Sequence, residues 1–273
     1  MNLSTKLIHF VKMQAGGNDF IVLDNRKNIY SGKFPQLASK LCQRKISIGA
    51  DGLLILGNKP GYDFQMRYFN ADGSEANFCG NGASCLALFA YQKKIAPAKM
   101  NFLTKSGIIS ATVEEGKVKL KMPNPERLNL DFSLDIDGKK YLFSFIDTGV
   151  PHTVNFVQEI NKINVNNLGK KIRYHNFFQP AGTNVNFAKI KNRSAISIRT
   201  YERGVEGETL SCGTGVVASA IIAGLKNLVS PPVEVLTQSG ETLKVYYQIK
   251  NNQIDEVYLE NSPKIVYTGE IEI

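Results

Sequence analysis

A short motif occurs twice in this chain of 273 residues, with a cysteine ahead of a glycine-rich turn and a run of small apolar residues. It reads CGNGASCLALF from Cys79 and CGTGVVASAII from Cys212, an offset of 133 residues (212 − 79). LTKSG and LTQSG follow the two motifs at the same offset, and MRYFN and IRTYE precede them. A looser echo joins AGGNDF to AGTNVNF. Several matches in one order predict a duplicated domain.

Strands dominate the predicted secondary structure. Short alternating or apolar runs separated by glycine turns predict strands at LIHFVKM, FIVLD, DFQMRYF, GKVKLKM, YLFSFID, VNFAKIK, AISIRTY and IVYTGEIEI. Helices are predicted after each CGxG and over PQLASKLCQR, where Pro35 occupies the first turn. We therefore predict the α+β class, with domains at 1–118 plus 263–273 and at 119–262. The last strand lies beyond the second repeat and could complete the first domain.

Composition excludes several classes of protein. The chain is 43% hydrophobic and 21% charged, as in ordinary globular proteins. Its apolar stretches fall short of the roughly 20 residues that a membrane-spanning helix needs. The start, MNLSTKLIHFVKM, lacks the pattern of a secretory signal. We expect a cytoplasmic protein without a membrane partner.

Charge and cysteine content narrow the partners further. The net charge is +9, but the lysines are dispersed and no RNA-binding or helix-turn-helix signature accompanies them. We therefore expect a solvated basic surface and no nucleic-acid partner. Four cysteines and three scattered histidines show no zinc spacing, which predicts free thiols and no metal.

A cysteine directly ahead of a helix suits acid–base chemistry. The unpaired N–H groups and the positive dipole end of the helix favour an anion, either a thiolate or a substrate carboxylate. The dipole alone lowers a thiol pKa by at most about 1.5 units, so a neighbouring group must complete the activation. Two such thiols on opposite faces of a stereocentre could invert it, one removing a proton and the other returning one.

The motifs in their context resemble the diaminopimelate epimerase family. The segments that carry this resemblance are FNADGSEANFCGNGASC, YERGVEGETLSCGTG, GGNDF, GADGLLI and GVPH, and the similarity runs from end to end. It implies two similar domains, each a β-sheet curled around a central helix, related by a pseudo-twofold axis with the site between them. It also implies a homodimer that interconverts LL- and meso-diaminopimelate, for lysine and peptidoglycan precursors, without a cofactor.

The resemblance assigns roles residue by residue. Cys79 is implied as the proton donor in the LL to meso direction and Cys212 as the acceptor, with His152 and Glu202 tuning the thiols. The implied substrate-binding residues are Asn18, Asn70, Gly80, Asn81, Asn184, Glu202, Arg203, Gly213 and Thr214. The backbone N–H groups after each thiol would bind the carboxylate of the reacting centre. Tyr267 matches a position linked to dimer contact.

Two positions depart from the family pattern. Val150 stands where many members have Asn, and Gly52 stands where some have Gln. Each change removes a possible polar contact to the distal end of the substrate. The exact substrate is therefore less firmly implied than the inversion chemistry.

Other interpretations remain open at this stage. Asn18 and Asn184 could be turn residues, Glu202 and Arg203 a surface ion pair, and His152 a structural histidine. The chain could also be a related isomerase of the same fold, such as a relative of proline racemase or of a phenazine-pathway isomerase. A redox or binding module with a Cys79–Cys212 disulfide, or a nucleic-acid-binding protein, are the non-enzymatic alternatives.

Overall fold

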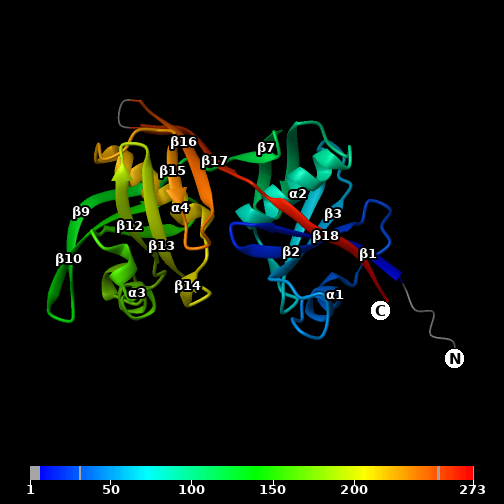
Figure 1. Cartoon of the computed structure of the whole chain (residues 1–273), viewed down its shortest axis with the longest axis horizontal. Helices are drawn as coiled ribbons and strands as arrows, with labels where there is room; N and C mark the ends of the chain where they lie inside the picture. Colours follow the sequence, from blue (N-terminus) through cyan, green and yellow to red (C-terminus); the bar gives the residue numbers. More distant parts are fainter. Residues whose placement is uncertain (1–6, 31, 251–252, 273) are drawn as a thin grey trace. The chain divides into compact units, whose positions relative to one another are not determined.

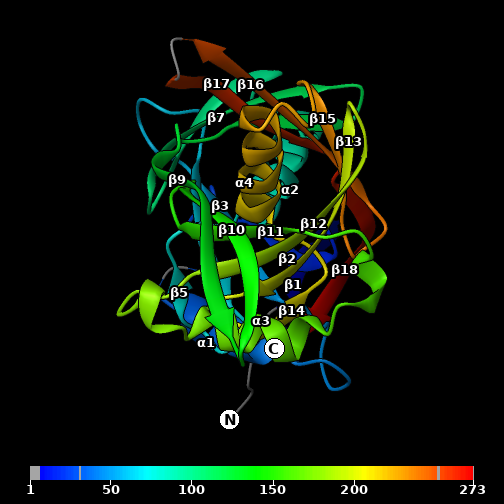
Figure 2. The ribbon, with the colours of Figure 1, turned by 90° about the vertical axis from the view of Figure 1, so that its left-hand side faces the viewer.

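The chain folds into two compact units, each dominated by strands (Figures 1 and 2). The computed structural model describes residues 7–30, 32–250 and 253–272. Unit 1 contains Met1–Leu120 and Asn261–Ile273, and unit 2 contains Lys121–Glu260. Within the described ranges, no helix is both long and apolar enough to cross a bilayer.

The sheet of unit 1 begins with the last strand of the chain. Its order is β18-β1-β2-β3-β4-β6-β7-β8, in which β2–β3 and β4–β6 pair parallel and the other neighbours pair antiparallel. The strands are β1 (Leu7–Ala15), β2 (Asn18–Asp24), β3 (Gly52–Gly57), β4 (Gln65–Asn70), β6 (Lys99–Thr104), β7 (Gly107–Glu114), β8 (Lys117–Lys121) and β18 (Lys264–Glu272). A short strand, β5 (Glu75–Ala76), pairs antiparallel with β4.

Unit 2 repeats this order and these strand directions. The sequence β9-β10-β11-β12-β13-β15-β16-β17 is parallel at β11–β12 and β13–β15 and antiparallel elsewhere. The strands are β9 (Glu126–Ile136), β10 (Lys139–Asp147), β11 (Pro151–Phe156), β12 (Asn184–Asn192), β13 (Ala195–Glu202), β15 (Val233–Leu236), β16 (Thr242–Lys250) and β17 (Gln253–Asn261). β14 (Gly207–Thr209) pairs with β13, as β5 does with β4. The two units therefore share one topology, with β18 in the place that β9 holds in unit 2.

A buried helix lies on one face of each sheet. α2 (Gly80–Gln92) packs against strands β1, β2, β3, β4 and β7, and every residue from Asn81 to Ala90 is buried. α4 (Gly213–Leu225) packs against β10–β13, β15 and β16, and every residue from Gly215 to Gly224 is buried. Figure 2 shows α4 with strands around it. Helices that are apolar all round belong inside a core, which explains the small apolar residues after each CGxG.

A second helix covers the opposite face of each sheet. α1 (Phe34–Leu41) follows β2, and α3 (Val165–Arg173) follows β11. Leu37 and Leu41 of α1 pack with Leu53 of β3, while Ile172 of α3 packs with Val185 of β12. Two short 3-10 helices, η1 (Ile160–Lys162) and η2 (Asn176–Phe178), flank α3. Because side chains alternate along a strand, the odd-numbered residues of β3 and β12 face α1 or α3, and the even-numbered ones face α2 or α4.

The structure confirms the predicted α+β class of two similar, mostly β domains. All eight predicted strands and the three predicted helices are present. α3 was not predicted. The exact domain boundaries and the pseudo-twofold relation stay predictions.

Candidate functional site

Cys79 is the N-cap residue of α2. Its backbone is extended, with φ −144° and ψ 117°, and its Sγ accepts a hydrogen bond from the backbone N–H of Gly82 at 3.5 Å. Gly82 lies close to β3, since a Cβ there would lie 3.0 Å from Cδ2 of Leu54. The half-buried sulfur therefore lies at the end of the helix where N–H groups and the dipole stabilise negative charge.

Asn18 and Asn81 meet beside this cysteine. The Nδ2 of Asn81 donates to Oδ1 of Asn18 at 2.9 Å, and the Nδ2 of Asn18 donates to Oδ2 of Asp51 at 3.0 Å. Asn70 ends β4 opposite Gly52 and donates its Nδ2 to Oγ of Ser74 at 3.0 Å. A hydrogen bond between two predicted site residues, Asn18 and Asn81, thus connects the start of β2 to the start of α2.

An unpredicted ion-pair cluster fixes Asp51. Arg44 donates to Oδ1 of Asp51 at 2.8 Å and to Asp19, and the Nζ of buried Lys12 lies 2.8 Å from Oδ2 of Asp19. Burial alone would raise the pKa of Asp19, but hydrogen bonds from Arg44 and Lys12 outweigh it and hold that pKa below its usual value. Arg44 thus holds in place the Asp51 carboxylate, which accepts the hydrogen bond from Asn18.

Cys212 is the N-cap residue of α4 and lies beside a histidine. Its backbone is also extended, with φ −126° and ψ 107°. Its Sγ lies 3.5 Å from Oγ1 of Thr214, and that oxygen lies 2.8 Å from Nε2 of His152. Complete burial, with a smaller contribution from the charge of Arg203, lowers the pKa of His152 to about 3. The imidazole is therefore neutral near pH 7.

Asn186, which the sequence analysis did not single out, lies behind His152. Its Nδ2 is 3.1 Å from Nδ1 of His152 and donates to the carbonyl oxygen of Thr153 at 3.1 Å. Its Oδ1 accepts from Oγ1 of Thr200 at 2.9 Å. A Cβ on Gly215 would lie 2.3 Å from that Oδ1, so the last glycine of the CGTG motif lets α4 approach the Asn186 amide.

Three further predicted residues lie at the ends of β12 and β13. Asn184 donates from Nδ2 to the carbonyl oxygen of Pro151 at 3.0 Å, and its Oδ1 accepts from the backbone N–H of Arg203 at 2.8 Å. The Arg203 Nη1 donates to the carbonyl oxygen of Ala181 at 3.0 Å. Burial raises the pKa of Glu202, against a smaller opposite effect of the nearby Thr209 hydroxyl. Glu202 and Arg203 are not ion-paired with each other among the described contacts.

The remaining predicted positions lie elsewhere in each unit. Tyr267 is on β18, 44% exposed, with its ring edge-to-face against Phe10 at 5.9 Å between centroids. Val150 is half-buried directly before β11. Gly52 is sterically constrained, because a Cβ there would lie 2.4 Å from Cε2 of Tyr68 and 2.6 Å from the carbonyl oxygen of Phe69.

The other two cysteines are core residues. Cys42 and Cys85 are both buried, and burial is the main cause that raises the pKa of Cys42 to about 12. None of the four cysteines forms a disulfide. Among the described residues, no group of three or more His, Cys, Asp or Glu is placed to hold a metal ion.

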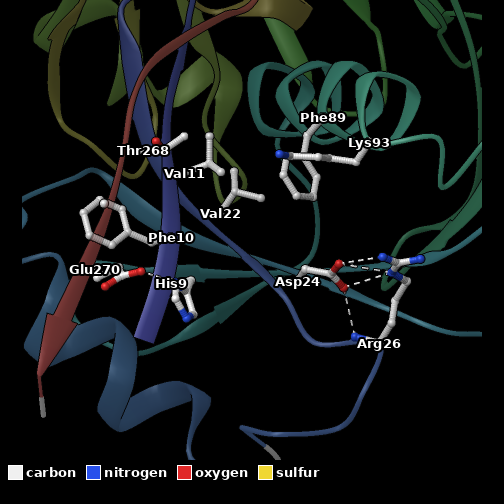
Figure 3. Close-up of a pocket in the computed structure, with 11 residues that line it drawn as sticks. His9, Phe10, Val11, Val22, Asp24, Arg26, Phe89, Lys93, Thr268 and Glu270 are labelled. Carbon is white, nitrogen blue, oxygen red and sulfur yellow. Dashed lines mark hydrogen bonds and ion pairs between the residues drawn. The ribbon is translucent and has the colours of Figure 1, made fainter. Parts of the chain in front are cut away.

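A separate pocket of about 570 Å³ opens on unit 1 (Figure 3). Its walls come from β1, β2, β18 and the end of α2, and include Val11, Val22, Phe89 and Lys93. Asp24 and Arg26 form an ion pair at its rim. None of the predicted site residues lines it, so we do not assign the chemistry to this pocket.

Comparisons with known proteins agree with the cysteine motifs. A family model described as diaminopimelate epimerase matches residues 10–128 and 144–266. A protein named diaminopimelate epimerase from Aquifex aeolicus (strain VF5) is 42% identical, covering 97% of this chain and 98% of its own length. One of the same name from Hydrogenobaculum sp. (strain Y04AAS1) is 43% identical over 94% of this chain and 96% of its own.

Solved structures share the fold at low sequence identity. A phenazine biosynthesis protein of the PhzF family from Bacillus anthracis has a TM-score of 0.72 at 14% identity and covers 98% of this chain and 100% of its own. A hydroxyproline epimerase from Agrobacterium vitis has a TM-score of 0.69 at 14% identity and covers 100% of this chain and 94% of its own. With a family model over most of the length and relatives above 40% identity, this chain belongs to the diaminopimelate epimerase family.

Proposed function

We propose that this enzyme interconverts LL- and meso-2,6-diaminopimelate without a cofactor, using Cys79 and Cys212 as its two bases. The relatives' names support the substrate. The observation that carries the mechanism is the equivalent placement of the cysteines. Each caps a buried helix at an extended residue, in units with one strand order. Cys42 and Cys85 lack this placement, since both are buried in a core.

The proposed reaction transfers two protons. In the LL to meso direction, the Cys212 thiolate takes the α-proton and becomes a thiol, leaving a carbanion at the α-carbon. The Cys79 thiol then gives its proton to the opposite face of that carbon and becomes a thiolate. Atoms and charge balance, and the enzyme ends with its two protonation states exchanged. The reverse reaction begins from that state, so the thiols must titrate as a coupled pair.

Helix starts would stabilise the carbanion. Its negative charge delocalises into the α-carboxylate, and the N-terminal N–H groups of a helix bind such an anion. We assign this role to the backbone of Gly80, Asn81, Gly213 and Thr214. Preorganised donors of this kind lose their effect if water enters, so the site must exclude solvent during turnover.

Side chains beyond the helices would select the substrate. Arg203 is anchored by its contact with Ala181, and its planar guanidinium suits the distal carboxylate of a diacid. Asn18, Asn70 and Asn184 are assigned to the polar groups of the substrate, beside their contacts within the protein. Burial raises the pKa of Glu202, and this carboxyl is proposed to tune a thiol.

The remaining assignments concern the assembly and its place in the cell. We propose a cytoplasmic homodimer that supplies lysine and peptidoglycan precursors, with Tyr267 at the dimer contact. The consecutive apolar residues Ile265, Val266 and Tyr267 of β18 are all exposed, which supports a protein partner on this strand. Analytical ultracentrifugation tests it, and a monomer at micromolar concentration would reject it.

Substrate competition tests the function. Purified enzyme in deuterated water should place deuterium at the α-carbon of diaminopimelate as LL substrate is epimerised, and should leave the α-proton of proline unchanged. Exchange on proline alone would instead indicate a related isomerase of the same fold. Absence of exchange, together with a Cys79–Cys212 disulfide under reducing conditions, would indicate a redox module. Cys79→Ala and Cys212→Ala should each abolish epimerisation with unchanged circular dichroism, whereas Cys85→Ala, the core control, should retain it.

A further inference from the structure

The two thiols have different surroundings at equivalent positions. The strand register places His152 opposite Asn184 and Asn186 opposite Thr200 in unit 2. The same register positions in unit 1 place Phe20 opposite Gly52 and Leu54 opposite Tyr68. The glycines agree with this alignment, because a Cβ on Gly82 would meet Leu54 while one on Gly215 would meet Asn186. A polar chain thus lies beneath Cys212, where unit 1 has Phe20, Leu54 and Tyr68.

The contacts of Asn186 fix which atoms donate and which accept along this series of hydrogen bonds. The carbonyl oxygen of Thr153 only accepts, so the Asn186 atom that faces it must be the amide nitrogen. The second N–H of that nitrogen points at Nδ1 of His152, which must therefore accept. The Thr200 hydroxyl donates to the amide oxygen and completes the assignment. Turning the amide over would bring two oxygens to 3.1 Å without a proton between them.

The directions of the remaining hydrogen bonds follow because the His152 imidazole is neutral. An imidazole that accepts at Nδ1 carries its proton on Nε2. This Nε2–H donates to Oγ1 of Thr214, 2.8 Å away, which leaves the hydroxyl proton of Thr214 available for Sγ of Cys212 at 3.5 Å. Donation from His152 polarises that hydroxyl, so the hydrogen bond to sulfur strengthens when the sulfur is a thiolate.

We propose that Asn186 is a positioning residue that sets the His152 tautomer and thereby aims the Thr214 hydroxyl at Cys212, whereas the matching strand positions of unit 1 hold Phe20, Leu54 and Tyr68. This inference rests on the proposed function for its catalytic meaning. His152 then stabilises the Cys212 thiolate through Thr214 instead of removing its proton. The two thiols differ as a result, and Cys212 is the thiolate of the resting enzyme.

Other titratable groups lie on or directly after strands that pack against α4. They are Glu202 at the end of β13, Arg203 directly after it, and Tyr247 of β16, whose hydroxyl donates to the carbonyl oxygen of Ala220 in α4. Arg203 disfavours a positive charge on His152, which supports the neutral ring. The test must therefore separate the hydrogen-bond chain from the general field of these charges.

Nitrogen-15 NMR of the histidine rings measures the tautomer directly, and the chain has only three histidines to assign. Wild-type His152 should carry its proton on Nε2. In Asn186→Asp the carboxylate accepts instead of donating, so the neutral ring should carry its proton on Nδ1. A loss of folding stability alone would not move the proton from one nitrogen to the other. Wild-type enzyme with the proton on Nδ1 would overturn the proposal.

Alkylation of the thiols against pH measures the consequence, with Cys79 of the same molecule as the reference. Thr214→Val keeps the shape and removes the hydroxyl, and should move the midpoint of Cys212 alkylation upward by about one pH unit. Thr214→Ser should restore the wild-type midpoint. Asn186→Leu, which installs the residue type of unit 1, should move the Cys212 midpoint in the same direction by less. The Cys79 midpoint should not rise in any of these variants, because a weaker Cys212 thiolate leaves its coupled partner unchanged or easier to ionise.

Two results of the alkylation experiment would contradict the proposed hydrogen bonds from His152 through Thr214 to Cys212. One is a Cys212 midpoint that Thr214→Val leaves unchanged, and the other is an equal shift of both cysteines, which would indicate a general field. Neither NMR nor alkylation uses a substrate. An enzyme that shows the tautomer and the Cys212 shift but does not act on diaminopimelate would reject the proposed function and keep the positioning role of Asn186.

Discussion

Gly52 is packed beneath Tyr68, which gives a physical reason for the departure from the family pattern at this position. A Cβ at this position would meet the Tyr68 ring at 2.4 Å and the Phe69 carbonyl oxygen at 2.6 Å. Gly52→Ala should therefore destabilise the fold by about 1–3 kcal/mol, measured by urea unfolding. Gly57→Ala, on the same strand with open space around it, is the control and should change stability little. Equal stability of the two variants would contradict the packing.

His152 should make the protein less stable in mild acid. Its pKa is about 3 in the folded chain against 6.5 as the ordinary value, so between these pH values the unfolded chain binds the extra proton. The free energy of unfolding therefore falls as the pH falls below 6.5, by about 2 kcal/mol at pH 5. His152→Gln should remove this part of the loss. Urea unfolding of both proteins at pH 7 and pH 5 measures it, and equal losses would contradict a buried neutral imidazole.

The sequence identified the residues with strong motifs and missed those defined by contacts. Cys79, Cys212, His152 and Thr214 stand in motifs, and the structure joins the last three. Asn186 was missed because an Asn in a strand carries no chemical signature of its own. The signal was available in the register of the repeat, since Asn186 occupies an inward position where the first half has Leu54.

At the scale of elements, an Arg–Glu pair fastens the short hairpin ahead of each cysteine. Arg199 bonds both oxygens of Glu208, at 2.7 and 2.8 Å, as Arg67 does with Glu75 at 2.7 and 3.0 Å. Arg199 also donates to the carbonyl oxygens of Ile160 and Ile163 at 3.0 and 2.9 Å. The duplication thus preserved a pair that holds β14 in unit 2 and β5 in unit 1.

Replacing each arginine by lysine should separate these contacts. Arg199→Lys should cost about 2 kcal/mol, because a lysine cannot keep the forked pair and both carbonyl contacts at once. Arg67→Lys should cost less, since the Arg67 pair is more exposed to water. Thermal unfolding of the two variants measures the difference. A larger loss for Arg67→Lys would contradict this ranking.

Some helices and strands could be predicted from the sequence and others could not. α2 and α4 follow from the CGxG turns and their small apolar residues, and the strands follow from alternation. α3 was missed because Gly169 interrupts its pattern, and the structure requires that glycine: a Cβ there would lie 2.5 Å from Cβ of Tyr201. Duplication could have predicted it, because α1 holds the same place in the first half.

For the whole molecule, unit 1 is built from both ends of the chain. β18 pairs with β1 from Leu7 to Gln14, and Ile271 packs against the core between α1 and the sheet. A chain that stops at Pro263 should leave β1 as an open edge. Hydrogen exchange should then accelerate in β1 and β2 and stay slow in β11 and β12 of unit 2. Unchanged protection of β1 would show that unit 1 does not depend on the last strand.

The central claim is that two thiols invert one carbon, each acting on its own face. The direct measurement is the position of deuterium in the first turnovers of LL-diaminopimelate in deuterated water, read by mass spectrometry after separating the stereoisomers. With two bases, the meso product should carry deuterium at the inverted carbon while the remaining LL substrate keeps its protium. A meso product that retains the original proton would mean that one base serves both faces, and would contradict the account.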